Sequence, residues 1–325
     1  MSRLFRDVGG QRLGSRGCVV CIGAFDGLHL AHRALIRHVR ERAQALAADS
    51  AVVSFEPLPR EFFAPPGEEP ARLLWPRHKL ALLDAEGMDR VGLLRFDRAL
   101  AAMEASEFVH TLLVGRLGAR EVWVGEDFRF GRGRRGDVAL LRQIGAEAGF
   151  RTESMPTVHV DGERVSSSRI RALLAAGDLA GAARLLGRPY TMGGRVVRGR
   201  QLGRTLGFPT ANLSLHGRRP ALGGIYAAWV HGVGAAPRAA VASLGTRPTV
   251  NGVEPLLEAH LFDFDGDLYG RLIEVEFVAW LRDEEKFEDL PALVAQMHDD
   301  AAAARAALAA LPARCIPSPT RGATA

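Results

Sequence analysis

The sequence predicts an α/β protein of two parts, a doubly wound parallel sheet followed by a small antiparallel β-barrel or sandwich with a C-terminal helix. In the first half, short apolar runs rich in β-branched residues alternate with helical patterns, which is typical of a parallel sheet covered on both faces. From about residue 187, short runs are separated by turns rich in Gly, Pro and Asn, which indicates antiparallel strands. We therefore predict a first domain of residues 1–186.

Four strands are predicted in the first half, with helical patterns between them. The strands are CVVCIG (18–23), AVVSF (51–55), VGLLRF (91–96) and EVWVG (121–125). One helix follows directly on the first strand. A second helix over 106–118 has Ser106 as its predicted N-cap, and a third over 137–149 is bounded by Asp137 and Gly149.

Five strands and a closing helix are predicted in the second half. The strands are GRVVRG (194–199), GIYAAWVHG (224–232), PRAAVASLG (237–245), LLEAHLFDF (256–264) and RLIEVEFVAWL (271–281). The helix covers 288–311, with Pro291 near its first turn. The second domain is therefore predicted to span residues 187–312, and the aperiodic residues 313–325 to form a disordered tail.

Composition and charge limit the classes of function. The chain has 325 residues, 47% of them apolar and 24% charged, which is typical of globular domains. Its formal net charge of +5 favours anionic ligands such as phosphates and nucleotides. No apolar run approaches the roughly 20 residues of a membrane helix, and the N-terminus has no apolar signal core. We expect a cytoplasmic protein with no membrane partner, either a monomer or a weak homo-oligomer.

Two patterns that look like metal sites are rejected. Cys18 and Cys21 form a C-x-x-C, but in a strand they point to opposite faces, so we expect neither a metal site nor a redox pair. The stretch DFDGDLYGRLIE (263–274) has acidic residues at several EF-hand positions, but Leu268 stands where the calcium loop needs Gly. We expect a hairpin at its Asp-Gly instead.

A pair of histidines follows the first strand, in GAFDGLHLAHRALI (23–36). His29 and His32 lie three residues apart and share one face of the first helical turn. A helix N-terminus presents free N–H groups to anions, and ligands bind at the carboxyl ends of parallel strands. The pair therefore predicts a phosphate site in which both imidazoles stabilise charge that develops in a transition state. A pair of surface histidines is the alternative.

Two further loops of the first half suit the same anion. VSSSRIR (165–171) has three hydroxyls with two arginines, and GEDFRFGRGRRGD (125–137) has several glycines and arginines after the fourth strand. Gly permits close approach of a ligand, and Arg pairs with phosphate. FEPLPREFF (55–63), after the second strand, would be another wall of the site, with a Pro-rich turn as the alternative.

A different pattern occurs in GRVVRGRQLGRTLGFPTANLSL (194–215). The chain has no Walker A motif, so P-loop chemistry is not supported. Thr210 and Asn212 offer the hard oxygen ligands that Mg²⁺ accepts together with phosphate and water, although a local turn is the alternative. Glu258 interrupts an apolar strand and could accept a hydroxyl proton if it faces a ligand, or it is an ordinary half-exposed glutamate.

The first half resembles the HxGH nucleotidylyltransferase superfamily, and within it the FMN adenylyltransferase module of prokaryotic bifunctional riboflavin kinase/FAD synthetases. The matching stretches are GAFDGLHLAH, SFEPLPREFF, VGEDFRFGRGRRGD and VSSSRIR. The resemblance implies a Rossmann-like fold in which FMN phosphate attacks the α-phosphorus of ATP and pyrophosphate leaves. It implies catalytic roles for His29 and His32. It implies ATP or phosphate contacts for Gly23, Phe25, Asp26, Asp127, Arg129, Ser166, Ser167, Ser168, Arg169 and Arg171.

The second half resembles the riboflavin kinase module of the same family, through LGRPY, GRTLGFPTANL, GIYA, SLGTRPTVNG, LEAHLFDFDGDLYG and LRDEEKF. The resemblance implies a six-stranded β-barrel with a C-terminal helix, and riboflavin, FMN and ATP as small-molecule partners. Thr210 and Asn212 would be ligands on the Mg²⁺ side, and Glu258 the base on the ribityl 5′-hydroxyl. Further contacts with ATP or flavin would come from Gly199, Gly203, Arg204, Gly207 and Pro209.

Two residues depart from the family pattern. Ala31 stands where the histidine motif has Gly, and Ser168 replaces a Thr but keeps the hydroxyl. Because an added methyl at position 31 could crowd ATP, a riboflavin kinase with an impaired adenylyl site is the alternative to a bifunctional enzyme. A nucleic-acid-binding protein is disfavoured, since the basic charge forms no stripe with interleaved aromatics. A flavin carrier without catalysis would be indifferent to loss of His29 or Glu258.

Overall fold

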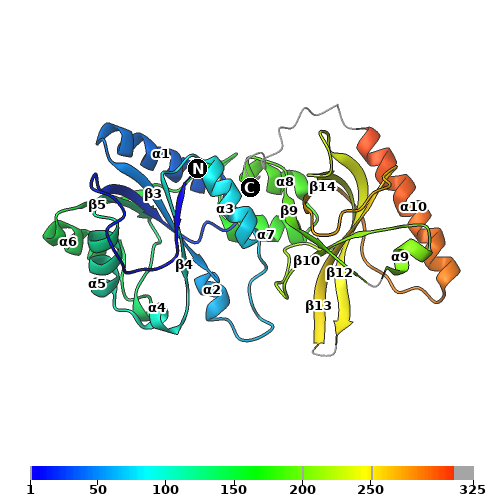
Figure 1. Ribbon diagram of the computed structural model, residues 1–325, viewed down its shortest axis with the longest axis horizontal. Coiled ribbons are helices and arrows are strands. Elements are labelled where there is room, and N and C mark those ends of the chain that lie inside the picture. Colours follow the sequence, from blue (N-terminus) through cyan, green and yellow to red (C-terminus); the bar gives the residue numbers. More distant parts are fainter. Residues whose placement is uncertain (1, 200, 250–251, 311–325) are drawn as a thin grey trace. The chain divides into compact units, whose positions relative to one another are not determined.

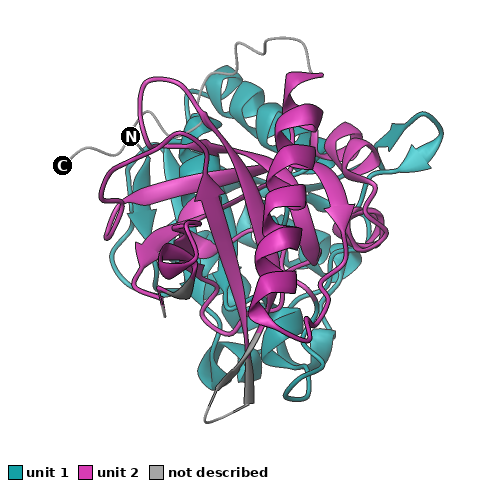
Figure 2. Ribbon diagram, turned by 90° about the vertical axis from the view of Figure 1, so that its right-hand side faces the viewer, with its two compact units in different colours: residues 1–70, 79–166 teal, residues 71–78, 167–325 magenta. Residues whose placement is uncertain are grey.

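The computed structural model of the chain describes residues 2–199, 201–249 and 252–310 (Figure 1). They fall into two compact units, which Figure 2 distinguishes by colour. The first unit contains residues 1–70 and 79–166, and the second contains 71–78 and 167–325. The predicted tail, residues 313–325, lies outside the described residues.

The first unit is built on a six-stranded sheet in the order β1-β4-β3-β2-β5-β6, and all neighbouring strands are parallel. This confirms the predicted parallel sheet. The sequence patterns miss the two edge strands, because β1 is too short to show periodicity and β6 is polar. The strands are β1 (Arg3–Phe5), β2 (Cys18–Ile22), β3 (Asp49–Glu56), β4 (Arg90–Arg95), β5 (Ala119–Gly125) and β6 (Arg151–Met155).

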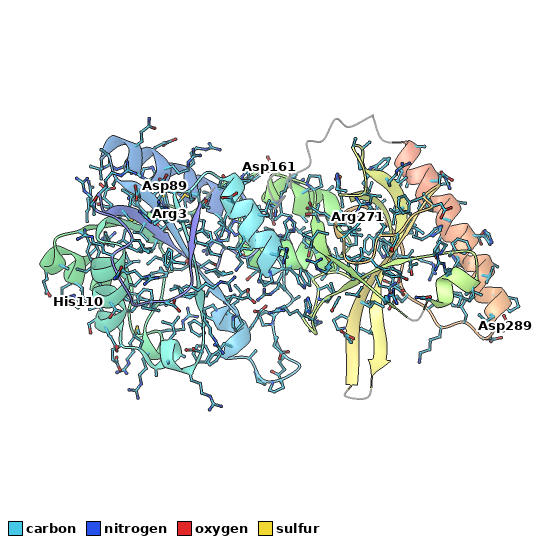
Figure 3. The ribbon with its side chains drawn as sticks, in the orientation of Figure 1. Arg3, Asp89, His110, Asp161, Arg271 and Asp289 are labelled. Atoms are coloured by element: carbon cyan, nitrogen blue, oxygen red, sulfur yellow. The ribbon has the colours of Figure 1, made fainter. Side chains whose placement is uncertain are left out.

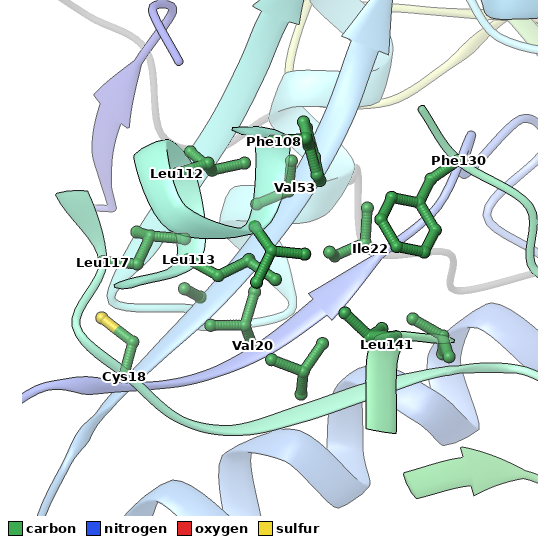
Figure 4. Close-up of a cluster of buried hydrophobic side chains, with 14 of the residues drawn as sticks. Cys18, Val20, Ile22, Val53, Phe108, Leu112, Leu113, Leu117, Phe130 and Leu141 are labelled. Atoms are coloured by element: carbon green, nitrogen blue, oxygen red, sulfur yellow. The ribbon is translucent and has the colours of Figure 1, made fainter. Parts of the chain in front are cut away.

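Helices cover both faces of this sheet, which explains why β2 is buried over its whole length. Helix α1 (Leu30–Ala45) packs on β2 and β3, while α5 (Ala105–Phe108), the π-helix η1 (Val109–Arg116) and α6 (Val138–Ala148) contribute to the core cluster in Figure 4. Cys18 belongs to that cluster and the buried Cys21 does not, as expected for opposite faces of a strand. Shorter elements are α2 (Pro59–Phe62), α3 (Pro76–Ala85), α4 (Arg98–Ala102), η2 (Arg132–Arg134), and a hairpin of β7 (His159–Val160) with β8 (Glu163–Arg164).

The helix predicted over 106–118 begins earlier than expected, and its predicted N-cap is wrong. Glu104 is the N-cap of α5 and makes no side-chain capping bond, so Ser106 lies inside the helix. From Val109 the helix continues as the π-helix η1. By contrast, α6 is bounded as predicted, because Asp137 accepts a hydrogen bond from Leu140 N at 2.9 Å and Gly149 adopts the left-handed conformation.

The second unit is a closed barrel of six antiparallel strands in the order β10-β13-β12-β11-β14-β9. Its closure confirms the six-stranded barrel that the resemblance implies. The sixth strand is β10, which lies within the stretch interpreted from sequence as a ligand loop. The strands are β9 (Thr191–Val197), β10 (Ala211–Ser214), β11 (Gly224–His231), β12 (Arg238–Thr249), β13 (Gly252–Leu261) and β14 (Leu272–Arg282).

Four helices accompany the barrel within the described residues. Helix α10 (Leu290–Ala309) packs on β11, β12 and β14, as the closing helix was predicted to do. Its N-cap is Asp289, labelled in Figure 3, which accepts a hydrogen bond from Ala292 N at 2.8 Å. The other helices are α7 (Ser167–Ala175), α8 (Leu179–Leu186) and the short α9 (Leu202–Thr205).

The hairpin predicted at the Asp-Gly of residues 263–274 is wrong. Strands β13 and β14 flank this stretch but do not pair, since β13 lies between β10 and β12. The stretch is therefore a connection across the barrel. Its first acidic side chain, Asp263, receives two hydrogen bonds from Arg305 of α10, at 2.9 and 3.0 Å.

A short piece of the N-terminal half belongs to the second unit. In residues 71–78, the backbone N–H of Arg72 donates to Arg219 O at 2.8 Å, and the indole of Trp75 donates to Leu215 O at 3.2 Å. The boundary predicted at 186/187 also differs from the unit division at 166/167, because α7 packs on α8 and α8 packs on β14. Among the described residues, no helix is long and apolar enough to cross a membrane.

Candidate functional site

A strained turn follows β2 at the carboxyl edge of the parallel sheet, from Gly23 to Leu28. Phe25 and Leu28 have positive φ angles, 47° and 41°, which residues other than glycine rarely adopt. Phe25 is fully buried and Asp26 is 1% exposed, so the surrounding fold holds the turn in place. Such strain persists only where the surroundings enforce it, and it gathers at functional sites.

The two predicted histidines meet directly behind this turn. His29 is the N-cap of α1, and its Nδ1 accepts a long hydrogen bond, 3.4 Å, from the backbone N–H of His32. The two rings stack with centroids 3.6 Å apart. Their positions at the helix N-terminus agree with the sequence prediction.

His32 is held in its neutral form. Burial, together with the charges of His29 and Lys79, holds the pKa of His32 well below its usual range. Its Nδ1 is buried without a hydrogen-bond partner, which favours the tautomer with the proton on Nε2. The ring therefore carries one N–H donor and no charge at neutral pH.

Lys79 is a residue of this region that the sequence analysis misses. It lies on α3, is fully buried, and donates from Nζ to the carbonyl oxygen of Ala24 at 2.9 Å. It also contacts Ser54 Oγ and Phe55 O, at 3.3 and 3.5 Å, at the end of β3. One compositional signal pointed to it, since Lys occurs only at positions 79 and 286 among 42 Lys and Arg residues.

Aromatic side chains gather at the carboxyl ends of β3 and β4. Phe62 and Phe63, from the FEPLPREFF stretch, pack edge to face with Phe96 at centroid distances of 5.3 and 5.8 Å. Phe55 packs against the same ring at 5.8 Å. Phe63 is 61% exposed, so part of this predicted wall presents an apolar face to solvent.

The Gly- and Arg-rich loop after β5 is tied down by ion pairs. Arg129 contacts Asp137, the N-cap of α6, at 2.9 Å, and Asp127 contacts Arg164 at 3.1 Å. The backbone N–H of Leu140 and the Arg129 guanidinium lower the pKa of Asp137. The predicted phosphate residues Asp127 and Arg129 thus have protein partners in this structure.

The predicted Ser and Arg cluster lies where the chain passes from the first unit to the second. Ser166 ends the first unit, and Ser167 opens α7 in the second. Arg171 donates from Nε to the carbonyl oxygen of Ala71, within the second unit. Ser168 and Arg169 are exposed.

In the barrel, three predicted residues come together. The hydroxyl of Thr210 donates to Glu258 Oε1 at 3.2 Å and accepts from the Asn212 amide at 3.3 Å. The register of β10 with β13 places Asn212 directly opposite Glu258. Ser243 of β12 lies opposite Glu258 on the other side, a neighbour that only the strand register reveals. The half-buried carboxylate of Glu258 therefore lies between two polar residues of the neighbouring strands, beside the Thr210 hydroxyl.

At several glycines of the loop before β10, close contacts or a positive φ disfavour any side chain. A Cβ at Gly203 would lie 2.3 Å from the carbonyl oxygen of Phe208, and Gly207 has a φ of 84°. A Cβ at Gly199 would lie 2.6 Å from the Asn212 side chain, so this loop runs directly over the Thr210 and Asn212 cluster. Arg204 is exposed on the same loop.

His260, two residues after Glu258 on β13, is a second residue that the sequence analysis misses. Its Nδ1 lies 2.9 Å from the carbonyl oxygen of Pro209, and its ring packs against Phe208. The spacing of two from Glu258 along a strand was the available signal, because it puts both side chains on one face. His260 thereby fixes the backbone directly before Thr210.

The barrel cluster fits a cation that arrives with a phosphate ligand. Thr210, Asn212 and Glu258 provide hard oxygens, which Mg²⁺ prefers. Among the described residues, no group of three or more His, Cys, Asp or Glu side chains could hold a metal ion without such a ligand. A magnesium ion that keeps several waters and phosphate oxygens needs only one or two protein ligands.

Comparisons with known families match both halves of the chain. A family model described as FAD synthetase matches residues 12–169, and one described as riboflavin kinase matches residues 186–308. The first range contains the histidine turn, and the second contains the Thr210, Asn212 and Glu258 cluster.

Individual relatives match nearly the whole chain. The bifunctional riboflavin kinase/FMN adenylyltransferase of Pseudomonas fluorescens is 46% identical over 305 residues, which cover 94% of this chain and 97% of that protein. The protein of the same name from Escherichia coli K12 is 46% identical, covering 89% of this chain and 92% of its own length. A crystal structure from Streptococcus pneumoniae, named a macrolide-efflux protein, has a TM-score of 0.74 at 29% identity and covers 93% of this chain and 99% of its own.

Proposed function

Because the chain belongs to the family of bifunctional riboflavin kinases/FMN adenylyltransferases, we propose that it makes FAD from riboflavin in two steps. The first step transfers the γ-phosphoryl group of ATP to riboflavin and yields FMN. The second transfers the adenylyl group of another ATP to FMN and releases pyrophosphate. The observation that carries the proposal is the match of both family models, in order, along one chain.

In the kinase step, Glu258 is the proposed base on the ribityl 5′-hydroxyl. Its hydrogen bond from Thr210 orients the carboxylate, and its half-buried position leaves it open to a ligand. Thr210 and Asn212 would hold Mg²⁺ together with ATP, and the ion would offset negative charge on the phosphates. Gly199, Gly203, Arg204, Gly207 and Pro209, in the loop before β10, are the proposed contacts for ATP or flavin.

In the adenylyl step, His29 and His32 are the proposed groups at the α-phosphate. A phosphate oxygen of FMN attacks the α-phosphorus, and the bond to pyrophosphate breaks without a covalent enzyme intermediate. Catalysis then depends on positioning and on donors fixed before the reaction. The stacked rings at the N-terminus of α1 are such a fixed pair. The remaining proposed ATP contacts are Gly23, Phe25, Asp26, Asp127, Arg129, Ser166, Ser167, Ser168, Arg169 and Arg171.

No observation favours a chain with the kinase activity alone. Ala31 lies in the first turn of α1 and does not have a positive φ, so the backbone there does not require Gly. Two relatives that are 46% identical to this chain carry names with both activities. We also propose a cytoplasmic location and a monomeric or weakly associated state.

The test is to incubate the purified chain with riboflavin, ATP and Mg²⁺ and to separate the flavins by chromatography. The wild type is expected to yield FMN and then FAD, and omission of Mg²⁺ to stop the first step. Absence of both products would reject the proposed function.

Separable variants assign the two sites. His29→Ala should block FAD but not FMN formation, with the exposed His110→Ala as its control. Glu258→Gln should block FMN formation while FAD still forms from supplied FMN, with the exposed Glu288→Gln as its control. One substitution that abolished both reactions in a folded chain would contradict the two-site assignment.

A further inference from the structure

A lysine is buried beneath the turn that carries the two histidines. Lys79 is 0% exposed, and its Nζ lies within hydrogen-bond distance of Ala24 O, Ser54 Oγ and Phe55 O. Ala24 belongs to the turn after β2, while Ser54 and Phe55 end β3. Lys79 therefore joins the carboxyl ends of two neighbouring strands, the edge where ligands bind in parallel sheets.

The hydrogen bonds identify the form of this side chain. The hydroxyl of Ser54 donates to Ala24 O at 3.0 Å, so its oxygen accepts from Lys79. These three contacts of Nζ are thus donations, and a neutral amine has only two N–H groups. An ammonium ion satisfies all three acceptors, and a buried charge is costly unless its surroundings need it.

The charge of Lys79 acts on His32. The titratable groups that face the His32 ring are His29, stacked on it, and Lys79; Phe25 is its apolar neighbour at 5.0 Å. Asp26 is buried in the same turn. Burial, with the neighbouring His29 and the charge of Lys79, lowers the pKa of His32, which keeps the ring neutral.

Position 79 has lysine in a chain whose other positive charges are almost all arginine. Lys occurs twice among 42 Lys and Arg residues, at positions 79 and 286. An ammonium is a compact charge with three donors in a tetrahedral arrangement, whereas guanidinium is a planar fork. Three acceptors around one nitrogen suit the first and not the second. This position requires the shape of lysine in a chain that otherwise uses arginine for positive charge.

We propose that Lys79 is a positioning residue for adenylyl transfer, which locks the histidine-bearing turn to the end of β3. The proposal rests on the proposed function of the first unit and deepens it. Lys79 is fully buried, so its proposed effect on the reaction is through the placement of His29 and His32.

The decisive variant is Lys79→Met, which shortens the unbranched side chain by only one atom and removes its charge and donors. We expect kcat for FMN adenylylation to fall on the order of 10²-fold, the cost of a misplacement of about 1 Å at a reacting centre. The pKa of His32 should rise, because the charge of Lys79 is gone. The acid limb of the pH–rate profile should then move to higher pH, and an NMR titration of the imidazole should show the same shift.

A second variant separates charge from geometry. Lys79→Arg keeps the charge but not the tetrahedral donors, so the rate should fall while the acid limb stays in place. The matched control is Arg77→Met, which removes an exposed charge from the same helix. Riboflavin phosphorylation by the same chain serves as the internal control, and it should be unchanged in all three variants.

Ser54→Ala tests the positioning role of Lys79 if Lys79→Met fails to fold. It removes the hydroxyl between Lys79 and the turn but leaves the charge. We expect a loss of about fivefold in adenylyl transfer, the equivalent of one ordinary hydrogen bond, with no shift of the acid limb. Equal adenylylation rates in Ser54→Ala and the wild type would then overturn the proposal.

Either of two results with folded Lys79→Met would overturn the proposal. One is FAD formation equal to that of Arg77→Met, and the other is a lost rate with an unmoved His32 titration. If the wild type itself formed no FAD, the proposed function would fail instead. The His32 titration in Lys79→Met would still show whether Lys79 controls this ring.

Discussion

A buried histidine–glutamate contact in the second unit leads to a prediction about stability. His78 Nε2 lies 3.1 Å from Glu274 Oε1, and their side chains are 6% and 5% exposed. The contact has the distance of a hydrogen bond but not its angles. Burial raises the pKa of Glu274, but His78, with Thr191 and the charge of His231, more than offsets this and leaves the pKa below its usual value. The carboxylate is therefore ionised in the folded protein at neutral pH.

His78→Ala would leave this carboxylate buried without its imidazole partner. Breaking a buried pair on one side costs about 3–5 kcal/mol, far more than the loss of an exposed pair. His78→Ala/Glu274→Gln removes the charge as well and should regain a large part of that loss. Because the folded pKa of Glu274 is depressed, the pair stabilises the wild type above the ordinary pKa of 4.5, and this is lost as pH falls through the folded pKa.

Urea unfolding followed by tryptophan fluorescence measures the effect. Three of the four tryptophans, Trp75, Trp229 and Trp280, lie in the second unit. A Trp123→Phe background therefore confines the signal to that unit, which avoids mixing two transitions. The single variant, the double variant and the parent are compared at pH 7 and again below pH 4.5.

The control is Arg305→Ala, which breaks the exposed pair with Asp263 in the same unit. Exposed pairs contribute little, so this variant should stay close to the parent. The reasoning is refuted if His78→Ala costs no more than Arg305→Ala. It is also refuted if the double variant is no more stable than His78→Ala, since the unpaired charge would then not be the cause.

Three further predictions concern separate parts of the chain. His260→Ala removes the contact with Pro209 O, so kcat for riboflavin phosphorylation should fall about fivefold. His260→Asn should retain most of the wild-type kcat. Equal loss of kcat in both variants would argue against a role for this contact. Ala31→Gly should leave the adenylylation rate unchanged, because Ala31 occupies ordinary helical backbone; a gain of FAD synthesis would instead support the kinase-only alternative. A fragment of residues 167–325 lacks only the 71–78 segment of the second unit, so the barrel should unfold at lower urea than in the full chain. Equal midpoints would show that the segment adds no stability.

Local signals were sufficient for the central elements of both units. Strand β2 is an unbroken apolar run, and α6 carries its own Asp and Gly boundaries, so neighbouring residues alone specify them. Where the local signal was weak, the prediction failed. Ser106 looked like a cap, but Glu104 occupies that position. The Asp-Gly at 265–266 looked like a hairpin, but the barrel order keeps β13 and β14 apart.

The candidate sites divide in the same way. Residue types and motif order were enough to single out His29, His32, Thr210, Asn212 and Glu258. The hydrogen bonds among the last three depend on the register of β10 with β13, which is a long-range pairing. Sequence patterns did not identify Lys79 and His260, because their partners, Ala24 and Pro209, are distant in the sequence.

Local sequence patterns specified which stretches become strands and helices in the two cores and which side chains are the candidates for the chemistry, because periodicity, caps and motifs are local properties. Only the tertiary structure decided that residues 71–78 join the barrel, that His78 meets Glu274, and that Lys79 is buried under the histidine turn. The physical reason is that burial and charge pairing arise when segments far apart in the chain close upon one another. No stretch of neighbouring residues encodes which distant group will neutralise a charge.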